Sequence, residues 1–202
     1  MPKKTGIVFV LAGTVLILSA LSLFLYNRYE DAHAGQEAES LLGDVQTIID
    51  ERETSVPTTP PETLAPELPI AEIEGYGYVG YISIPKLELE LPVMSEWDYA
   101  RLKIAPCRQF GSSRTDDLVI AAHNYESHFG YLYQLELGDQ VIFTDMDGIE
   151  NLYEVTGLDT LNPIEVDAVQ NSGHDLVLYT CTYEGKTRVT VFCDRKKETP
   201  LR

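Results

Sequence analysis

The sequence predicts a mainly β domain that follows a single N-terminal membrane helix. Between residues 75 and 197 the chain contains about eight short segments that are rich in apolar, β-branched and aromatic residues and are joined by polar turns. Only small helical stretches interrupt them, and this spacing is typical of a closed or nearly closed β-barrel. The membrane helix is predicted by an uncharged, apolar run at residues 6–26.

The apolar run has the length of a transmembrane helix, because residues 6–26 would extend about 30 Å as an α-helix. A pair of lysines precedes the run, whereas Glu30 and Asp31 follow it. This charge bias predicts that residues 1–5 are cytoplasmic and that the rest of the chain is extracellular. A cleaved signal peptide is the alternative, but the run is longer than the usual ~7–15 apolar residues and favours a retained signal anchor.

Residues 27–72 are predicted to form an acidic stalk and a Pro-rich linker. Arg52 is the only basic residue among many acidic ones between residues 30 and 74, and the net charge of the whole chain is −17. The sequence shows no basic stripe, which argues against nucleic acid as a partner. The Pro-rich stretch at residues 54–69 should be extended and should hold the domain away from the bilayer.

A short amphipathic helix is expected inside the stalk. Apolar residues recur there at helical spacing between acidic residues, at Leu41, Leu42, Val45, Ile48 and Ile49. Self-association or docking is one interpretation of this stripe. The stripe is too short for a stable coiled coil, so the favoured interpretation is a helix that packs on its own domain or lies exposed.

The predicted β domain spans residues 73–202. We expect a strand at residues 81–84, then a half-buried strand at 87–93 whose solvent face carries Glu88, Glu90 and Pro92. The uniformly apolar segment 118–122 should be a buried strand.

A hairpin is predicted around Asp145 to Gly148, which strands at 140–144 and 151–155 flank. Asp145, Asp147 and Glu150 could suggest a calcium loop, but the remaining ligands of that motif are missing. A turn is the better interpretation, because Asp-Gly supplies the positive φ that such turns require.

The candidate nucleophile is Cys181. Strands at 175–181 and 188–193, joined by a polar loop, would form a hairpin that places Cys181 opposite Arg188, roughly 5 Å apart at Cβ. A guanidinium beside a thiol favours the thiolate and can steady a developing oxyanion. The candidate base is His123, which follows the buried strand at 118–122.

Other residues of the same types compete for these roles. His128 lies in a setting typical of loop packing, His174 lies in a turn that should be exposed, and His33 precedes the domain. Arg195 belongs to a basic tail and is expected to be a solvated charge. The other two cysteines, Cys107 and Cys193, are either a disulfide or two buried thiols, and the odd cysteine count leaves at least one thiol unpaired.

These residues resemble the sortases, which are cysteine transpeptidases of Gram-positive cell surfaces. The family signature, Thr-Leu-x-Thr-Cys, appears at residues 177–181 with Val177 in place of the first Thr, and an upstream His and a downstream Arg match His123 and Arg188. The segments 80–85 and 91–93 resemble the opening strands of the family, so the resemblance spans roughly residues 75–197. The gap of seven residues between Cys181 and Arg188 is shorter than in several sortase classes, and the resemblance is to the class B or class D type.

The resemblance implies an eight-stranded barrel and a reaction. Cys181 would attack the Thr carbonyl of a Leu-Pro-x-Thr-Gly-like sorting signal on a surface protein and form a thioacyl enzyme. His123 would protonate the departing Gly amine, and Arg188 would bind the substrate backbone or the oxyanion. An amine from a peptidoglycan precursor or a pilin would then resolve the intermediate; the pattern implies no cofactor and no metal.

Three further residues are candidates around this centre. The family pattern implies that the Thr180 side chain contacts the substrate. Asn124 is a candidate for binding substrate or for orienting His123, and Glu184 is a candidate for orienting His123 or the loop after Cys181.

Two other functions remain open on the sequence alone. One is another exported cysteine peptidase, which would be expected to lack an arginine after the nucleophile strand. The other is an anchored, non-catalytic binding module in which Cys181 is a core thiol. The reactivity of Cys181 distinguishes the second from the enzymes.

Overall fold

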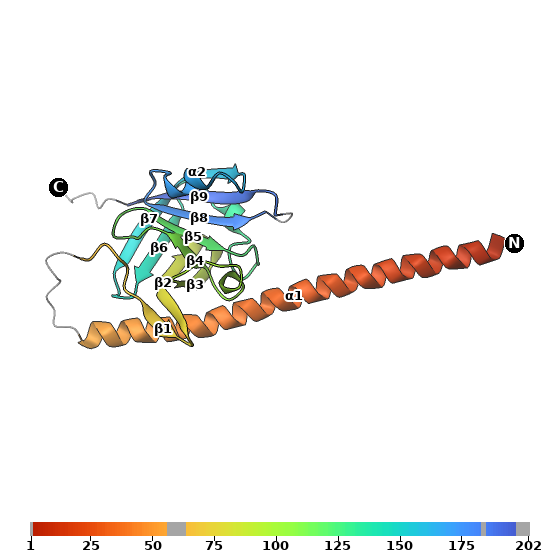
Figure 1. The fold of residues 1–202 in the computed structure, drawn as a ribbon, viewed down its shortest axis with the longest axis horizontal. Coiled ribbons are helices and arrows are strands. Elements are labelled where there is room, and N and C mark those ends of the chain that lie inside the picture. Colours follow the sequence, from red (N-terminus) through yellow and green to blue (C-terminus); the bar gives the residue numbers. More distant parts are fainter. Residues whose placement is uncertain (1, 56–63, 183–184, 197–202) are drawn as a thin grey trace. The chain divides into compact units, whose positions relative to one another are not determined.

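The computed structural model describes residues 2–55, 64–182 and 185–196. Its first element is a long helix, α1 (Pro2–Ser55), which Figure 1 shows. The chain divides into two compact units, one that ends at His33 and one that begins at Ala34. The helix is long and apolar enough near the N-terminus to cross a membrane. A signal sequence would have the same property, so the helix is a candidate membrane span.

The second unit is built on one mixed sheet that closes into a barrel. The order of its strands is β1-β2-β3-β4-β5-β8-β9-β7-β6, and β6 also pairs with β2, so the eight strands from β2 to β9 form a closed ring with β1 outside it. The prediction of an eight-stranded barrel is confirmed. The strands are β1 (Ala71–Ile73), β2 (Tyr76–Ile84), β3 (Leu89–Met94), β4 (Cys107–Phe110), β5 (Leu118–Ala122), β6 (Gln140–Asp145), β7 (Glu150–Leu161), β8 (Leu176–Cys181) and β9 (Arg188–Arg195).

Short helices connect some of these strands. Single 3₁₀ turns lie at Pro85–Leu87, Arg101–Lys103 and Leu132–Gln134, and a short helix, α2 (Val166–Gln170), lies between β7 and β8. The strands β1 and β4 and the helix α2 were not predicted, because each is too short to show a periodic pattern.

Gly80 makes the barrel closure possible. At this residue β2 bulges and pairs with β3 on one side and with β6 on the other. Its φ is +145°, and a Cβ added there would lie 1.9 Å from the carbonyl oxygen of Thr144. Only glycine allows the two backbones to approach so closely.

Three hydrophobic clusters hold the unit together. The largest includes alternate residues of β2, β3, β5, β6, β8 and β9, among them Ile82, Val93 and Ile120. The second packs α1 against β1, β2 and β4, and the third packs α2 against the neighbouring faces of β5 and β8. Pro92, which was expected on the solvent side of its strand, is buried, because β3 is covered on both faces from Leu91 onward.

The C-terminal part of α1 belongs to this unit. Ala38 contributes to the largest cluster, while Leu41, Val45 and Ile49 are buried in the second cluster with Tyr78 and Met146. The amphipathic stripe therefore packs on its own domain, which is the favoured interpretation of the sequence pattern. Residues 34–55, assigned above to the stalk, form part of the compact unit, and residues 56–63 of the Pro-rich stretch lie outside the described residues.

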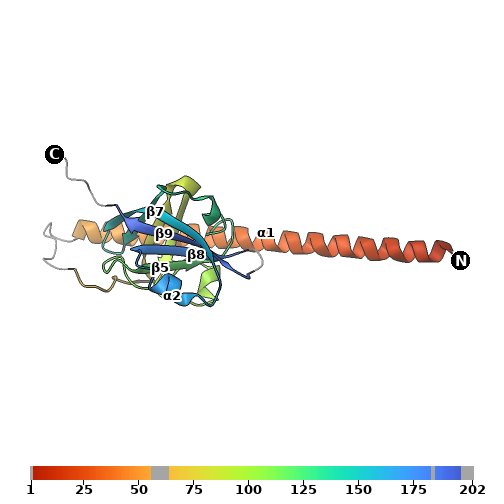
Figure 2. The same cartoon turned by 90° about the horizontal axis from the view of Figure 1, so that it is seen from above.

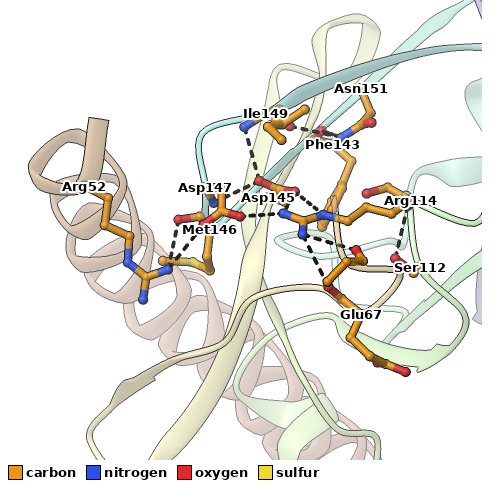
Figure 3. Close-up of polar contacts among 12 residues, drawn as sticks. Arg52, Glu67, Ser112, Arg114, Phe143, Asp145, Met146, Asp147, Ile149 and Asn151 are labelled. Carbon is orange, nitrogen blue, oxygen red and sulfur yellow. Dashed lines mark hydrogen bonds and ion pairs between the residues drawn. The ribbon is translucent and has the colours of Figure 1, made fainter. Parts of the chain in front are cut away.

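A buried arginine ties the linker to the β6–β7 turn. Arg114 donates to Asp145 Oδ2 at 2.8 Å and to Asp147 Oδ2 at 2.6 Å, and it also donates to the backbone carbonyls of Ala65 and Glu67 (Figure 3). The other oxygen of Asp145 accepts backbone N–H groups within the turn. The aspartates of this hairpin thus bind an arginine and the turn backbone, and the predicted turn is observed.

Arg195 has a similar role at the end of β9. It donates to Asp116 Oδ1 and to Asn151 Oδ1, and its guanidinium lies over the ring of Tyr153 at 5.2 Å. The expectation of a solvated tail charge is therefore wrong for this residue. The structural role depends on partners far away in the sequence, which a charge run does not reveal.

We expect Arg114→Ala to destabilise the domain by about 3 kcal/mol, because the Asp145 carboxylate, in a side chain only 1% exposed, would lose its cationic partner. Urea unfolding followed by circular dichroism measures the change. Arg101→Ala is the matched control, since Arg101 pairs with the more exposed Glu96 and Asp98. A loss for Arg114→Ala no larger than that for Arg101→Ala would contradict the structural role of the pair.

Candidate active site

Three adjacent strands bring the predicted catalytic residues to one edge of the barrel. β5 and β8 are parallel with Ala122 opposite Thr180, so the next residues along the two strands are His123 and Cys181. β8 and β9 are antiparallel with Cys181 directly opposite Arg188. β5, β8 and β9 run side by side in Figure 2, and strands in a sheet are about 4.8 Å apart, so the three residues are neighbours.

Thr180 connects β8 to β5 just before the candidate nucleophile, Cys181. Its hydroxyl donates to the carbonyl oxygen of Ala122 at 2.9 Å, and the residue is only 3% exposed. This bond fixes the positions of His123 and Cys181 relative to each other. The structure thus gives the Thr180 side chain a role in joining the strands, and the expected contact with the substrate stays a prediction.

His123 is held by the two residues that follow it. Its Nδ1 atom accepts the backbone N–H of Asn124 at 3.1 Å and lies 3.1 Å from the Asn124 Oδ1 atom. The Tyr125 ring stacks on the imidazole with a centroid distance of 4.2 Å and an interplanar angle of 3°. Asn124 therefore contacts the candidate base, as the orienting role predicts, and a substrate-binding role for Asn124 stays a prediction.

The arginine is placed by the loop that joins β8 and β9. Thr182 and Thr187 close this loop with a backbone hydrogen bond of 3.0 Å, and Arg188 Nη1 donates to the carbonyls of Gly185 and Thr187. Glu184 lies outside the described residues. The planar guanidinium thus has a fixed anchor in its own loop beside Cys181.

A groove of about 210 Å³ extends from Arg188 along the outside of the barrel. Tyr179 lies in this groove and donates a hydrogen bond of 2.6 Å to Gln109 Oε1, and burial raises the Tyr179 pKa, so its hydroxyl stays protonated. One wall is the segment before and within α2, and the other is the segment after β3. The lining residues are Trp97, Tyr99, Gln109, Leu161, Asn162, Pro163, Glu165, Val166, Val169, Tyr179 and Arg188.

Sequence reasoning missed this groove and the stacked Tyr125. The groove depends on the packing of α2 against the sheet, and α2 has no sequence signal of its own. The stack has one weak signal, because side chains at positions i and i+2 of an extended chain point to the same side.

Two of the competing histidines, His128 and His174, pack against other parts of the domain. His128 is 1% exposed within the loop after His123, as its setting predicted. His174 was expected to be exposed, but its side chain is only 32% exposed and its Nδ1 lies 3.0 Å from Asp194 Oδ1. Its ring also contacts Phe192.

All three cysteines are free thiols. Cys107 and Cys193 are buried, and burial raises the pKa of Cys107 to about 12 and also raises the pKa of Cys193. Cys107 and Cys193 are therefore two buried thiols and do not form a disulfide. Among the described residues, no group of three or more His, Cys, Asp or Glu side chains could hold a metal ion.

We expect iodoacetamide at pH 8 to modify Cys181 alone in the native protein. Cys107 and Cys193 are buried and stay protonated at that pH because their pKa values are raised, so neither supplies a thiolate. Peptide mapping by mass spectrometry identifies the modified residue, and Cys181→Ser is the control without a label. Modification of Cys107 or Cys193 before unfolding would show that the barrel is open where the structure buries it.

Comparison with known proteins shows which solved structures this chain is similar to. The chain is similar to sortase C1 from Streptococcus agalactiae, with 25% identity, 63% of this chain and 72% of that chain covered, and a TM-score of 0.54. It is also similar in fold to a sortase D5 transpeptidase from Clostridium perfringens, with 17% identity, coverage of 80% and 99%, and a TM-score of 0.60.

A third similar structure is that of Clostridium perfringens sortase C with the C-terminal cell wall sorting motif, with 20% identity, coverage of 78% and 90%, and a TM-score of 0.53. A comparison with curated proteins gave no significant match. The model of the sortase domain matches residues 82–196, which is more than half of the chain and includes His123, Cys181 and Arg188. The protein belongs to the sortase family.

Proposed function

We propose that this protein is a membrane-anchored cysteine transpeptidase that cleaves a Leu-Pro-x-Thr-Gly-like sorting signal and transfers the surface protein to an amine. The observation that carries the proposal is the strand register, which sets Cys181 opposite Arg188 and beside His123. A nucleophile, a proton carrier and a fixed cation are the three groups that acyl transfer requires.

The reaction follows from the roles of these three residues. The Cys181 thiolate attacks the Thr carbonyl, and Arg188 donates hydrogen bonds to the oxyanion that forms. The Thr–Gly bond then breaks, and His123 gives its proton to the departing Gly amine. An incoming amine loses a proton to His123 and attacks the thioester, which releases the Cys181 thiolate and completes the transfer.

The groove beside Arg188 is the proposed site for the sorting signal. Aromatic and aliphatic walls suit the Leu and Pro side chains of such a signal, and Arg188 at one end suits the peptide backbone near the scissile bond. A similar structure, the Clostridium perfringens sortase C, contains a cell wall sorting motif. The acceptor would be the amine of a peptidoglycan precursor or of a pilin.

The N-terminal part of α1 is the proposed anchor. It is a candidate membrane span, and the lysines before it together with the acidic residues after it favour a cytoplasmic N-terminus and an extracellular catalytic domain. We also propose that the protein is a sortase of the class B or class D type.

A non-catalytic binding module is the second candidate function. It would use the same groove without acyl transfer, and Cys181 would be an unreactive thiol. The half-buried position of Cys181 beside a guanidinium favours the enzyme.

We expect the full-length chain in detergent to convert Leu-Pro-x-Thr-Gly-like peptides into Thr–amine products through a thioacyl adduct on Cys181. Mass spectrometry of the intact protein and of the peptides detects both species. Cys181→Ala should form neither product, and Cys107→Ala should form both, because Cys107 is buried away from the site. If no peptide of a broad panel reacts and Cys181 also resists alkylation, the binding module becomes the better account.

Arg188→Lys should lower kcat by roughly 100-fold while the domain remains folded, because lysine lacks the planar fork of donors for the oxyanion. Steady-state kinetics with the best peptide measures the change, and circular dichroism checks the fold. Arg52→Lys, at the far end of α1, is the matched control and should keep full activity. An Arg188→Lys variant with an unchanged kcat would remove Arg188 from the reaction.

A further inference from the structure

We propose that Tyr125 is a positioning residue for His123, which holds the imidazole in the one orientation that carries the proton of the reaction. This inference rests on the proposed function. The strand register places the backbone of His123 beside Cys181, but His123 follows the last residue of β5, so the strand does not fix its ring. The contacts of the His123 ring therefore determine its orientation.

Two contacts leave one ring nitrogen for the chemistry. Nδ1 is occupied by Asn124, which offers a backbone N–H to the neutral ring and the Oδ1 atom to a protonated ring. The Tyr125 ring covers one face of the imidazole in a nearly parallel stack. Nε2 is the remaining nitrogen, and it is the atom that exchanges protons with Cys181, the leaving amine and the incoming amine.

Tyr125 can hold the imidazole because its own backbone is fixed in a tight loop. Its carbonyl oxygen accepts the N–H of His128 at 3.0 Å and the N–H of Gly130 at 2.8 Å. A Cβ on Gly130 would lie 2.6 Å from that carbonyl oxygen, so the loop requires glycine there. Phe129, which is fully buried, donates its N–H to the His123 carbonyl and closes the loop.

The geometry separates positioning from substrate binding. Tyr125 is not among the residues that line the groove beside Arg188. Loss of its ring should therefore affect the proton transfers and leave the affinity for the peptide unchanged. An imidazole that rotates among several orientations would be productive only part of the time, and misplacement by about 1 Å can lower a rate by roughly 100-fold.

The first test measures the stack without any reaction. In the Cys181→Ala background, the carbon-bound ring protons of His123 are observed by NMR and assigned with a His123→Gln variant. The stacked ring should shield these protons, so Tyr125→Leu should shift their signals downfield, whereas Tyr125→Phe should keep them in place. Tyr133→Leu is the matched control, because Tyr133 is exposed in the same segment and pairs with Tyr131.

The second test measures the consequence for turnover. Tyr125→Leu should lower kcat by about 10-fold or more with KM for the peptide unchanged, Tyr125→Phe should restore kcat, and Tyr133→Leu should match the wild type. Unshifted His123 signals in Tyr125→Leu would show that the stack is absent in solution and would overturn the proposal. Shifted signals with an unchanged kcat would also overturn it, because the orientation would then not matter.

The two tests also distinguish this inference from the proposed function. If the wild-type chain transfers no peptide, the transpeptidase fails and the role of Tyr125 in it fails as well, while the NMR shifts still decide whether Tyr125 holds the ring. If the wild-type chain is active and Tyr125→Leu behaves like the wild type, the function stands and the positioning role alone is rejected.

Discussion

The in-register parallel pairing of β5 with β8 is the constraint on which the site depends. Alternate residues of the two strands pack in different places: Leu118 and Leu176 belong to the cluster inside the barrel, and Val119 and Val177 belong to the cluster under α2. A slip of one residue would exchange these two sets, so packing on both faces fixes the register. The same register places Cys181 beside His123, because each follows the last aligned pair.

Beyond the strands, the site depends on what supports the loop after His123. The Cys181 and Arg188 side chains belong to one hairpin, and its closed loop holds them. The His123 loop needs outside support, and α1 gives part of it: a Cβ on Gly35 would lie 2.9 Å from the Cβ of Ser127, so the helix backbone lies directly against this loop. The part of α1 that begins at Ala34 thus packs against the loop that follows the proposed general acid and base.

The sequence predicted the parts of the site that chain connectivity controls. Cys181 and Arg188 lie in one hairpin, so their opposition follows from strand lengths, and His123 follows a strand that is apolar at every position. The sequence could not predict contacts between segments that lie far apart along the chain. For example, the hydroxyl of Thr180 donates a hydrogen bond to the carbonyl of Ala122 on the neighbouring strand, a contact that the sequence pattern does not show. Arg195 was expected to be solvated, because its partner Asp116 lies 79 residues away in the sequence and the pairing could not be foreseen.

The hydrogen-bond acceptors of Arg188 differ from those of Arg114 and Arg195 in this acidic chain. The sequence holds 15 Lys and Arg residues against 32 Asp and Glu residues, so carboxylates are available for almost any arginine. Arg114 and Arg195 follow this expectation and bind aspartates that join loops to the barrel. Within the part of the chain that the structure describes, the hydrogen bonds of Arg188 instead go to two backbone carbonyls of its own loop. In the proposed reaction, a guanidinium held in that way opposite Cys181 would stabilise a thiolate and an oxyanion.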